Sequence, residues 1–405
     1  MLKNLILISF LFTGIFSLTI PLHNLVYAQN SSITAATKAN ATETATETAA
    51  AATKANATET AATKANATET AATKANATET AATKANATET AATKANAPEI
   101  KTPPLTPKNF NIAVASDWGC NEDAQKTADN IQSKNPELVI AGGDLSYKGS
   151  GACWTDLIAP FESKTTISMG DHEYHDTDGG KAGAVSDYLK PLGMTSTYYS
   201  FNLNNVHIVA IDPYVEYGLN SAQYKFVVND LKNAYNNQKI DWIFVIEHIP
   251  LYSSASKHPA NSTIRDIFHP LFDKYNVDLV FSGDNHNYQR TYPLTYNTAD
   301  SSTPIITKKD HSNYKDDKSG VIYIISGTAG RSHYDIKEQS PFVSKQDDTQ
   351  FGFLNIDIKS DNALVGTFYA NEKDPNYNPI SNTNQIGNIL DKFTISKLAT
   401  TGSLT

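Results

Sequence analysis

Five segments of the chain end in side chains that can bind metal ions, and an apolar run precedes each of them. In chain order the residues are Asp117, Asp144 with Tyr147, Asp171 with His172, His248, and Asp284 with His286. One aspartate after a strand is usually a cap and one histidine is usually structural, but five such endings favour a metal site. Two cations held there would bind a phosphoryl group and acidify a water molecule for attack on phosphorus.

The apolar runs before these residues have the pattern of buried strands. Strands are predicted at residues 111–115, 137–140, 165–169, 242–246 and 277–281. Helical patterns at 121–133, 221–236 and 262–275 alternate with them, as in βαβ units. Ligands of such folds bind at the carboxyl edge of the sheet, where the ends of the strands meet.

Further strands are expected along the rest of the chain. A hairpin is predicted from 197–201 and 206–211, and single strands at 321–325, 353–357 and 364–369. So many strands with interleaved helices predict an α/β fold, a four-layer αββα sandwich of two facing mixed sheets flanked by helices. We expect this catalytic domain to span residues 110–397, followed by a tail at 398–405.

The composition and the N-terminus point to an exported protein. The formal net charge of −9 argues against nucleic acid as a partner, because phosphate backbones need a basic surface. Residues 1–28 look like a signal peptide, with Lys3 before an apolar run that is short for a spanning helix. An uncleaved anchor is the alternative. We expect cleavage, a secreted or cell-surface location, and no stable membrane span in the mature chain.

Residues 29–109 form a low-complexity arm that repeats the decapeptide AATKANATET and ends in a proline-rich linker. The arm has almost no large apolar side chains, so it cannot bury enough surface to fold, and we predict a disordered, solvated stalk. The stalk could associate the protein with a cell surface. Asn-Ala-Thr glycosylation acceptors occur at Asn40, Asn56, Asn66, Asn76 and Asn86, and Asn-Ser-Thr at Asn261.

The chain has two cysteines, Cys120 and Cys153. A pair of cysteines in an exported protein is a reasonable candidate for a disulfide. Each follows a predicted metal-binding strand end, so the two loops should be neighbours. The alternative is two unpaired buried thiols.

The ordered motifs resemble the calcineurin-like metallophosphoesterase superfamily and, within it, the purple acid phosphatases. The family order is D-x-G, G-D-x-x-Y, G-N-H-(D/E), an isolated His after a strand, and G-H-x-H. This sequence reads DWG, GDLSY, GDHE, VIEH and GDNH, and YYSF, VHIVAID and ISGTAGR also look like family segments. The resemblance covers residues 110 to 358. Plant members of the family add an N-terminal β-sandwich, whose position the repeat arm takes here.

The resemblance implies a dinuclear centre of ferric iron plus a divalent ion (Fe, Mn or Zn), with tyrosinate as a ligand suited to ferric iron. The implied ligands are Asp117, Asp144, Tyr147 and His286 for the first metal, and Asp144, Asp171, His248 and Asp284 for the second.

Two further histidines have roles implied by the same resemblance. His172 would interact with the phosphoryl oxygens. His258 lies ten residues after His248, where the family has a substrate histidine, and it could protonate the leaving oxygen. The alternative for His258 is an ordinary surface histidine.

The chain departs from the family pattern at two ligands of the second metal. Asp171 stands in place of an asparagine, and Asp284 in place of the first histidine of G-H-x-H. The second site should therefore favour hard, oxygen-seeking ions such as manganese or ferrous iron over imidazole-preferring metals. Alternatively, Asp284 turns away and the second metal is held weakly.

Three functions remain open at this stage. The leading one is an exported phosphatase that hydrolyses small phosphate monoesters by attack of a metal-activated hydroxide. A phosphodiesterase or nucleotidase of the same fold is the second, and a surface-displayed interaction protein with a degraded second metal site is the third. Asp212 and Glu247 could orient ligands, and Arg290 and Arg331 could meet phosphate, although surface ion pairing is more typical of arginine.

Overall fold

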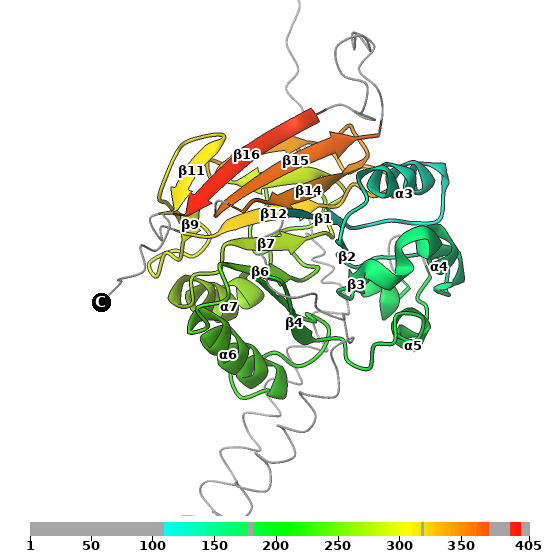
Figure 1. Ribbon diagram of the computed structural model, residues 1–405, viewed down its shortest axis with the longest axis horizontal. Coiled ribbons are helices and arrows are strands. Elements are labelled where there is room, and N and C mark those ends of the chain that lie inside the picture. Colours follow the sequence, from blue (N-terminus) through cyan, green and yellow to red (C-terminus); the bar gives the residue numbers. More distant parts are fainter. Residues whose placement is uncertain (1–108, 177–180, 317–319, 361, 372–388, 398–405) are drawn as a thin grey trace, which may run out of the picture. The chain divides into compact units, whose positions relative to one another are not determined.

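The computed structural model describes residues 109–176, 181–316, 320–360, 362–371 and 389–397 (Figure 1). The expected signal peptide, the repeat arm up to residue 108 with its acceptor asparagines, and the tail at 398–405 lie outside the described residues. Within those ranges, no helix has the length and apolar character needed to cross a bilayer.

The first of two seven-stranded mixed sheets has the strand order β11-β16-β15-β14-β1-β2-β3. Its strands are β1 (Phe110–Ala115), β2 (Leu138–Ala141), β3 (Thr165–Ile167), β11 (Asn313–Asp316), β14 (Gly352–Ile358), β15 (Ala363–Ala370) and β16 (Ile389–Lys397). Strands β1, β2 and β3 run parallel, and β1 also pairs antiparallel with β14. The carboxyl ends of the three parallel strands therefore share one edge.

The second sheet has the order β13-β8-β12-β7-β6-β5-β4. Its strands are β4 (Tyr199–Leu203), β5 (Val206–Ala210), β6 (Trp242–Ile246), β7 (Leu279–Ser282), β8 (Tyr288–Thr291), β12 (Ile322–Ser326) and β13 (Val343–Asp347). Strands β5, β6, β7 and β12 are parallel. A separate short ribbon pairs β9 (Leu294–Thr295) with β10 (Ile305–Ile306).

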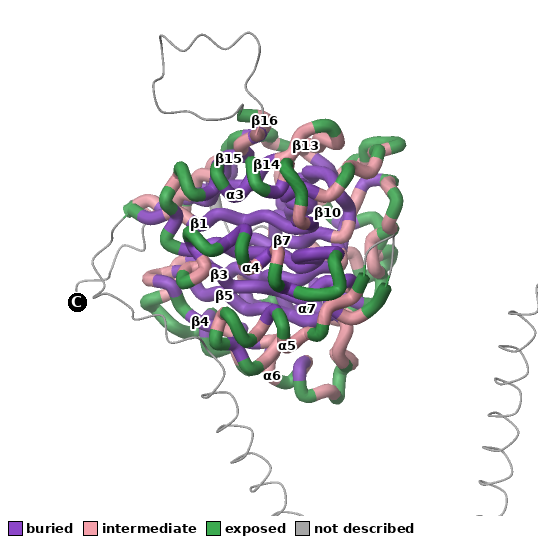
Figure 2. Tube along the Cα trace, turned by 90° about the vertical axis from the view of Figure 1, so that its right-hand side faces the viewer, coloured by how far each residue is buried: buried purple, intermediate pink, exposed green. Residues whose placement is uncertain are grey.

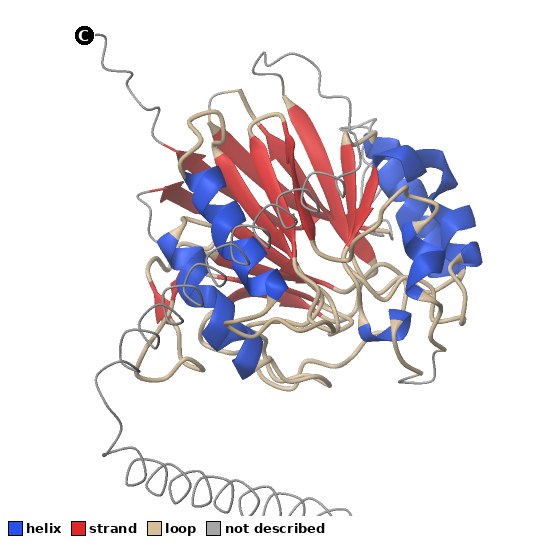
Figure 3. Cartoon of the chain, turned by 90° about the horizontal axis from the view of Figure 1, so that it is seen from below, coloured by secondary structure: helices blue, strands red, loops and turns tan. Residues whose placement is uncertain are grey.

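Helices cover the outer faces of both sheets, as Figure 3 shows. They are α3 (Glu122–Lys134), α4 (Ala152–Ile158), α5 (Val185–Leu189), α6 (Ala222–Tyr235) and α7 (Ser262–Lys274), with 3₁₀ turns at Ala159–Lys164 and Asp171–Glu173. Asn121, Ser221 and Asn261 cap α3, α6 and α7, because each side-chain oxygen accepts a backbone N–H in the first turn.

The alternation of side chains along the second sheet separates two apolar cores. Ile208 of β5 and Phe244 of β6 belong to the core that also contains Val114 of the first sheet, which places this core between the sheets. Val209 and Val245, one residue further on, pack in the other core with residues of α6 and α7. Figure 2 shows the buried strands inside an exposed outer layer. The predicted four-layer αββα fold is confirmed.

The observed strands differ from the prediction mainly at their ends. Strand β3 ends at Ile167 rather than at residue 169, and β7 begins at Leu279 rather than at 277. The chain leaves β3 early to form the 3₁₀ turn that carries Asp171. Strands β8, β11, β13 and β16, and helices α4 and α5, were not predicted, because they are short or carry many polar residues.

Candidate metal centre

The predicted ligands meet where the carboxyl edges of the two sheets come together. Asp117, Asp144 and Asp171 follow β1, β2 and β3 of the first sheet, and His248 and Asp284 follow β6 and β7 of the second. A backbone hydrogen bond of 2.9 Å from Ser116 to Ser326 joins the two sheets at this edge. Residues more than a hundred positions apart are thereby brought together.

The backbone itself is unusual at four of the ligands. Asp117, Asp144, Tyr147 and Asp284 have φ values of 60°, 54°, 58° and 66°. For residues other than glycine this left-handed conformation costs on the order of 1 kcal/mol or more, and it persists where the surrounding structure enforces it. Such concentrated strain is typical of functional sites and aims these side chains into one place.

The four ligands expected at the first metal form a tight cluster around the Tyr147 phenol. Tyr147 Oη donates to Asp144 Oδ2 at 2.8 Å and to Asp117 Oδ1 at 3.3 Å, and it lies 3.1 Å from His286 Nε2. His286 Nδ1 donates to the Ser332 carbonyl at 2.8 Å, so Nε2 presents its lone pair to the cluster. The Tyr147 phenol thus contacts the other three residues, and one donor atom each of Asp117, Asp144 and His248 also lies within 4.8 Å of the others.

The ligands expected at the second metal are more widely spaced. His248 Nε2 lies 3.4 Å from Asp144 Oδ1 and 3.8 Å from Asp171 Oδ1. One donor atom each of Asp171, His248 and Asp284 lies within 4.8 Å of the others. Asp284 therefore does not turn away from the site. Asp144 contacts both clusters, as a bridging carboxylate would.

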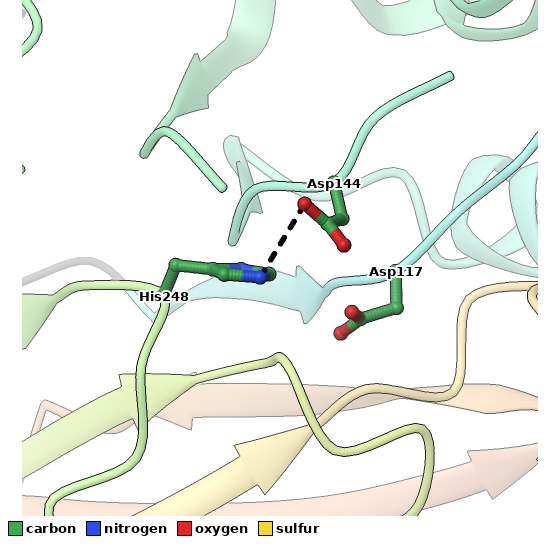
Figure 4. Close-up of side chains that lie close together, drawn as sticks. All are labelled: Asp117, Asp144 and His248. Atoms are coloured by element: carbon green, nitrogen blue, oxygen red, sulfur yellow. Dashed lines mark ion pairs between the residues drawn. The ribbon is translucent and has the colours of Figure 1, made fainter. Parts of the chain in front are cut away.

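Orphaned polar atoms show that the residues fit metal ions. His248 Nδ1 donates to the Gly142 carbonyl at 2.8 Å, which leaves Nε2 as the free donor. Among the described residues, neither His248 Nε2 nor Asp117 Oδ2 has a hydrogen-bond partner, although both are buried. Unpaired polar atoms are costly in a protein interior unless something binds them. Figure 4 shows Asp117, Asp144 and His248 facing one another, with the His248–Asp144 contact dashed.

The electrostatics also favour bound cations. Burial raises the pKa of Asp117 well above its ordinary value, and the nearby Asp144 and Asp284 carboxylates add to the shift, while His248 opposes it. Burial likewise raises the pKa of Asp284 to about 6. Burial lowers the pKa of His286 to about 3, which keeps the imidazole neutral and able to bind a metal. Cations would relieve the crowding of buried carboxylates.

Glu173 holds the two metal-binding loops together, a role that the sequence did not reveal. Its carboxylate accepts the N–H groups of Asp144 and Leu145, both at 2.9 Å, and of Gly170 at 2.7 Å. The side chain is buried, so its hydrogen bonds fix the loop that carries Asp144 against the loop that carries Asp171. The acidic residue at the end of the GDHE motif is the sequence feature that could have indicated this role of Glu173.

Both histidines expected to act on substrate lie at the centre. The backbone N–H of His172 donates to Asp144 Oδ1 at 3.1 Å, and its ring lies 4.1 Å from the Tyr147 ring. His258 Nδ1 lies 3.9 Å from Asp284 Oδ1, and 30% of its side chain is exposed. His258 therefore lies beside the expected second metal site, with one side open to solvent.

Two tyrosines near the centre were not assigned from the sequence, and Arg331, which the sequence suggested could bind phosphate, lies at the first cluster. The Tyr334 ring stacks on His286 at 3.8 Å. The Arg331 guanidinium lies 4.5 Å from the centre of the Tyr147 ring, on the side of the first cluster. The Tyr214 ring lies 6.5 Å from the His248 ring, on the side of the second. Isolated tyrosines in loops give no sequence signal of their own.

Three other residues do not act as the sequence suggested. Arg290 neither meets phosphate nor forms a surface pair. Its Nε donates to Asp391 Oδ2 at 2.6 Å in a buried ion pair that ties β8 to β16. Asp212 accepts from Tyr174 Oη at 2.6 Å and from the backbone N–H of Tyr214 at 2.9 Å. Glu247 is buried, and neither of its carboxylate oxygens has a hydrogen-bond partner among the described residues.

Cys120 and Cys153 form a disulfide with a Cα–Cα distance of 6.0 Å. Cys120 lies three residues after Asp117, and Cys153 lies six residues after Tyr147. The covalent bond therefore connects the loops that supply three of the four ligands of the first cluster.

Two facing mixed sheets with outer helices, and an Asp, His and Tyr cluster at their shared edge, define the metallophosphoesterase fold. Residues 110–288 match the calcineurin-like phosphoesterase family. The match runs from the first residue of β1 to the first residue of β8, and relatives that the chain matches are purple acid phosphatases.

Purple acid phosphatase 22 of Arabidopsis thaliana is 30% identical over 230 residues, which cover 53% of this chain and 52% of that protein. Purple acid phosphatase 1 of Ipomoea batatas is 30% identical over 286 residues, 62% of this chain and 57% of that protein. The structure of purple acid phosphatase PPD1 from yellow lupin (Lupinus luteus) seeds superposes with a TM-score of 0.58 at 21% identity, covering 73% of this chain and 55% of that one. The chain thus spans little more than half the length of these relatives.

Proposed function

We propose that this protein is a phosphatase that hydrolyses small phosphate monoesters at a dinuclear metal centre. The observation that carries the proposal is the convergence of two ligand clusters that share one carboxylate, Asp144, with buried donor atoms left over on Asp117 and His248. Similarity to purple acid phosphatases supports it. The residues expected to act on substrate, His172 and His258, lie beside the clusters.

The proposed first metal site consists of Asp117, Asp144, Tyr147 and His286, and the proposed second site of Asp144, Asp171, His248 and Asp284. We propose ferric iron for the first site, because its tyrosine can bind as a hard anionic ligand. For the second site, three carboxylates and one imidazole favour manganese or ferrous iron over zinc. When bound, the two cations would neutralise phosphoryl oxygens and acidify a water molecule.

The protein side chains would bind the phosphoryl group and move one proton. His172, packed on Tyr147 beside Asp144, would hydrogen-bond a phosphoryl oxygen. Water attacks phosphorus, the P–O bond to the organic group breaks, and His258 gives its proton to the leaving oxygen. The products are inorganic phosphate and an alcohol. His258 is suited to this step because its ring lies beside Asp284 and is partly open to solvent.

We further propose that the enzyme is exported. The support comes from the signal-like residues 1–28 and the pair of cysteines. The arm at 29–109 would act as a glycosylated stalk, and residues 110–397 as the catalytic domain. Association with a cell surface would occur through that stalk.

The proposal is tested by loading purified protein with iron and manganese and measuring three substrates in parallel. We expect close to two metal ions per chain by elemental analysis and turnover of phenyl phosphate well above that of bis(4-nitrophenyl) phosphate and of AMP. A preference for the diester or the nucleotide would instead support a phosphodiesterase or nucleotidase. One metal ion per chain with no turnover would support a surface interaction protein and contradict the proposal.

A further inference from the structure

A cleft of about 420 Å³ lies between the loop that follows β5 and the N-terminal half of α7. The cleft is lined by residues that include Pro213, Tyr214, Glu216, Tyr217, Thr263 and Ile267. The proposed catalytic chemistry uses none of them. The volume is in the range of pockets that take small organic ligands.

Tyr214 connects the cleft to the metal centre. This residue lines the cleft, and its ring lies 6.5 Å from the ring of His248, a proposed ligand of the second metal. Asp212 Oδ1 accepts the Tyr214 backbone N–H at 2.9 Å, and the Tyr174 ring lies 5.5 Å from the Tyr214 ring. Tyr214 is therefore held in place as a wall shared by the two sites. A substrate with its phosphoryl group on the metals could extend its organic part past this ring.

The walls of the cleft are aromatic and aliphatic, with one acidic group. Tyr214, Tyr217 and Ile267 provide the apolar surface, and the cleft has no lysine, arginine or histidine among the described residues that line it. The only charged lining residue of the described set is Glu216, whose Oε1 accepts the N–H of Gly218 at 2.9 Å and so stays on its own loop. An aromatic ring fits between such walls, whereas a second anionic group would be repelled by Glu216.

We propose that this cleft binds the organic part of the substrate and that the preferred occupant is an uncharged aromatic alcohol. The enzyme then favours aryl monoesters over small aliphatic monoesters and over aryl esters with a second negative charge. This inference rests on the proposed phosphatase activity and adds to it the chemical class of the leaving group. Tyr217, Ile267 and Glu216 become residues that determine specificity.

The first test compares Tyr217→Ala with Tyr224→Ala in the metal-loaded enzyme. The Tyr217 and Tyr224 rings both pack on Phe268, at 6.1 and 6.2 Å, but only Tyr217 lines the cleft. The two variants thus lose the same core contact. We expect the ratio of kcat/KM for phenyl phosphate to kcat/KM for glycerol 2-phosphate to fall about tenfold in Tyr217→Ala, the value of one good aromatic contact. The ratio should stay unchanged in Tyr224→Ala.

The second test uses Glu216→Gln, which keeps an oxygen to accept the Gly218 N–H while removing the charge. We expect the ratio of kcat/KM for 4-carboxyphenyl phosphate to kcat/KM for phenyl phosphate to rise several-fold at low ionic strength. The rise should shrink at high ionic strength, because salt screens exposed charges. An unchanged ratio would show that Glu216 does not face the leaving group.

The outcomes separate failure of this inference from failure of the proposed function. If the wild-type enzyme hydrolyses neither phenyl phosphate nor glycerol 2-phosphate, the proposed function is wrong. If it hydrolyses both and the ratio is the same in Tyr217→Ala as in Tyr224→Ala, the cleft is not the leaving-group site, although the function stands. Should Tyr217→Ala fail to fold, Ile267→Ala, on the α7 side of the cleft, must lower the same ratio for the inference to hold.

Discussion

The two ligand clusters of the centre differ in how firmly the chain holds them. In the first cluster, Asp117, Asp144, Tyr147 and His286 are all buried, with at most 4% of each residue exposed. In the second, the side chains of Asp171 and Asp284 are 23% and 14% exposed, and only His248 is fully buried. The Tyr147 phenol also contacts the other three residues of the first cluster. The four residues of the second cluster, Asp144, Asp171, His248 and Asp284, include no such shared phenol.

The supporting contacts explain this difference. The disulfide connects the loops that supply three residues of the first cluster, whereas the Glu173 carboxylate joins the Asp144 loop to the Asp171 loop and so supports both clusters. Asp171 and Asp284, in contrast, lie at the open edge of the two sheets. We therefore expect the proposed first site to be preorganised and selective for its metal, and the proposed second site to adapt and exchange its metal more readily. The two departures from the family pattern, Asp171 and Asp284, both fall in the adaptable site.

Removal of the shared carboxylate of Asp144 should eliminate metal binding at both sites, and with it the difference between them. Asp144→Asn leaves both sites one charge short, so we expect loss of both metals and a fall in kcat/KM for phenyl phosphate of about a thousandfold or more. Elemental analysis and steady-state assays measure the two effects. Asp156→Asn, on the exposed face of α4, is the matched control and should keep both metals. A variant that retained two metals per chain would refute the bridging role.

Loss of the phenol should damage the first site alone. In Tyr147→Phe, three short polar contacts disappear, and we expect the visible absorption of an iron–tyrosinate complex to vanish, with kcat/KM falling roughly a hundredfold. Manganese at the second site should remain. Tyr174→Phe removes a phenol that binds Asp212 instead and should keep the colour. A coloured Tyr147→Phe protein would contradict the ligand assignment.

Restoring the family residue should change metal preference at the second site alone. Asp284→His replaces a hard oxygen donor by imidazole, so the ratio of zinc to manganese affinity should rise by about tenfold. Competitive metal titration of protein with iron already bound measures the ratio. If the ratio did not move, Asp284 would not be a ligand. If the iron content fell as well, the two sites would not be independent.

The pH dependence of the chelator-treated protein should also report on the second site. The pKa of Asp284 is raised by burial to about 6, above its ordinary value of 3.8, so the folded state binds this proton more tightly than the unfolded state does. The free energy of unfolding should therefore decrease as pH rises from about 4 to about 6. Asp284→Asn should flatten this slope, measured by denaturant unfolding at several pH values. A slope of the opposite sign would contradict the buried, crowded environment of Asp284.

The smallest effect is expected from opening the disulfide. Replacing both Cys120 and Cys153 by serine frees the loops of the first cluster while leaving their other hydrogen bonds in place. We expect iron to dissociate a few-fold faster, with manganese dissociation unchanged. Stopped-flow chelation measures both rates. Equal acceleration at the two sites would show that the bond stabilises the whole domain rather than one cluster.

The sequence predicted most of the strands, and the residues expected as ligands lie together in the structure, because each of them follows a run with a clear strand pattern. Asp117, Asp144, His248 and His286 could be grouped only because parallel strand ends share an edge and because the motifs occur in family order. Strands with many polar residues, such as β16, gave no such pattern. The buried partner of Arg290 could not be foreseen either, because Asp391 lies 101 residues away.

Contacts made by backbone groups could not be predicted from the sequence either. Glu173 acts through the N–H groups of Asp144, Leu145 and Gly170, which any residue type could supply. Aspartate adopts the left-handed conformation more often than most residues other than glycine, but the sequence did not show that Asp117 and Asp144 in particular would adopt it.

The antiparallel pairing of β1 with β14 bears on how the enzyme is made. Strand β1, which precedes Asp117, pairs on one side with β14 (Gly352–Ile358), a strand near the C-terminal end of the chain. During synthesis, one edge of β1 therefore remains unpaired until β14, and with it nearly the whole domain, has been made. We therefore expect the proposed first metal site to be completed late in the maturation of this protein, and a chain released early would present an open sheet edge to its neighbours.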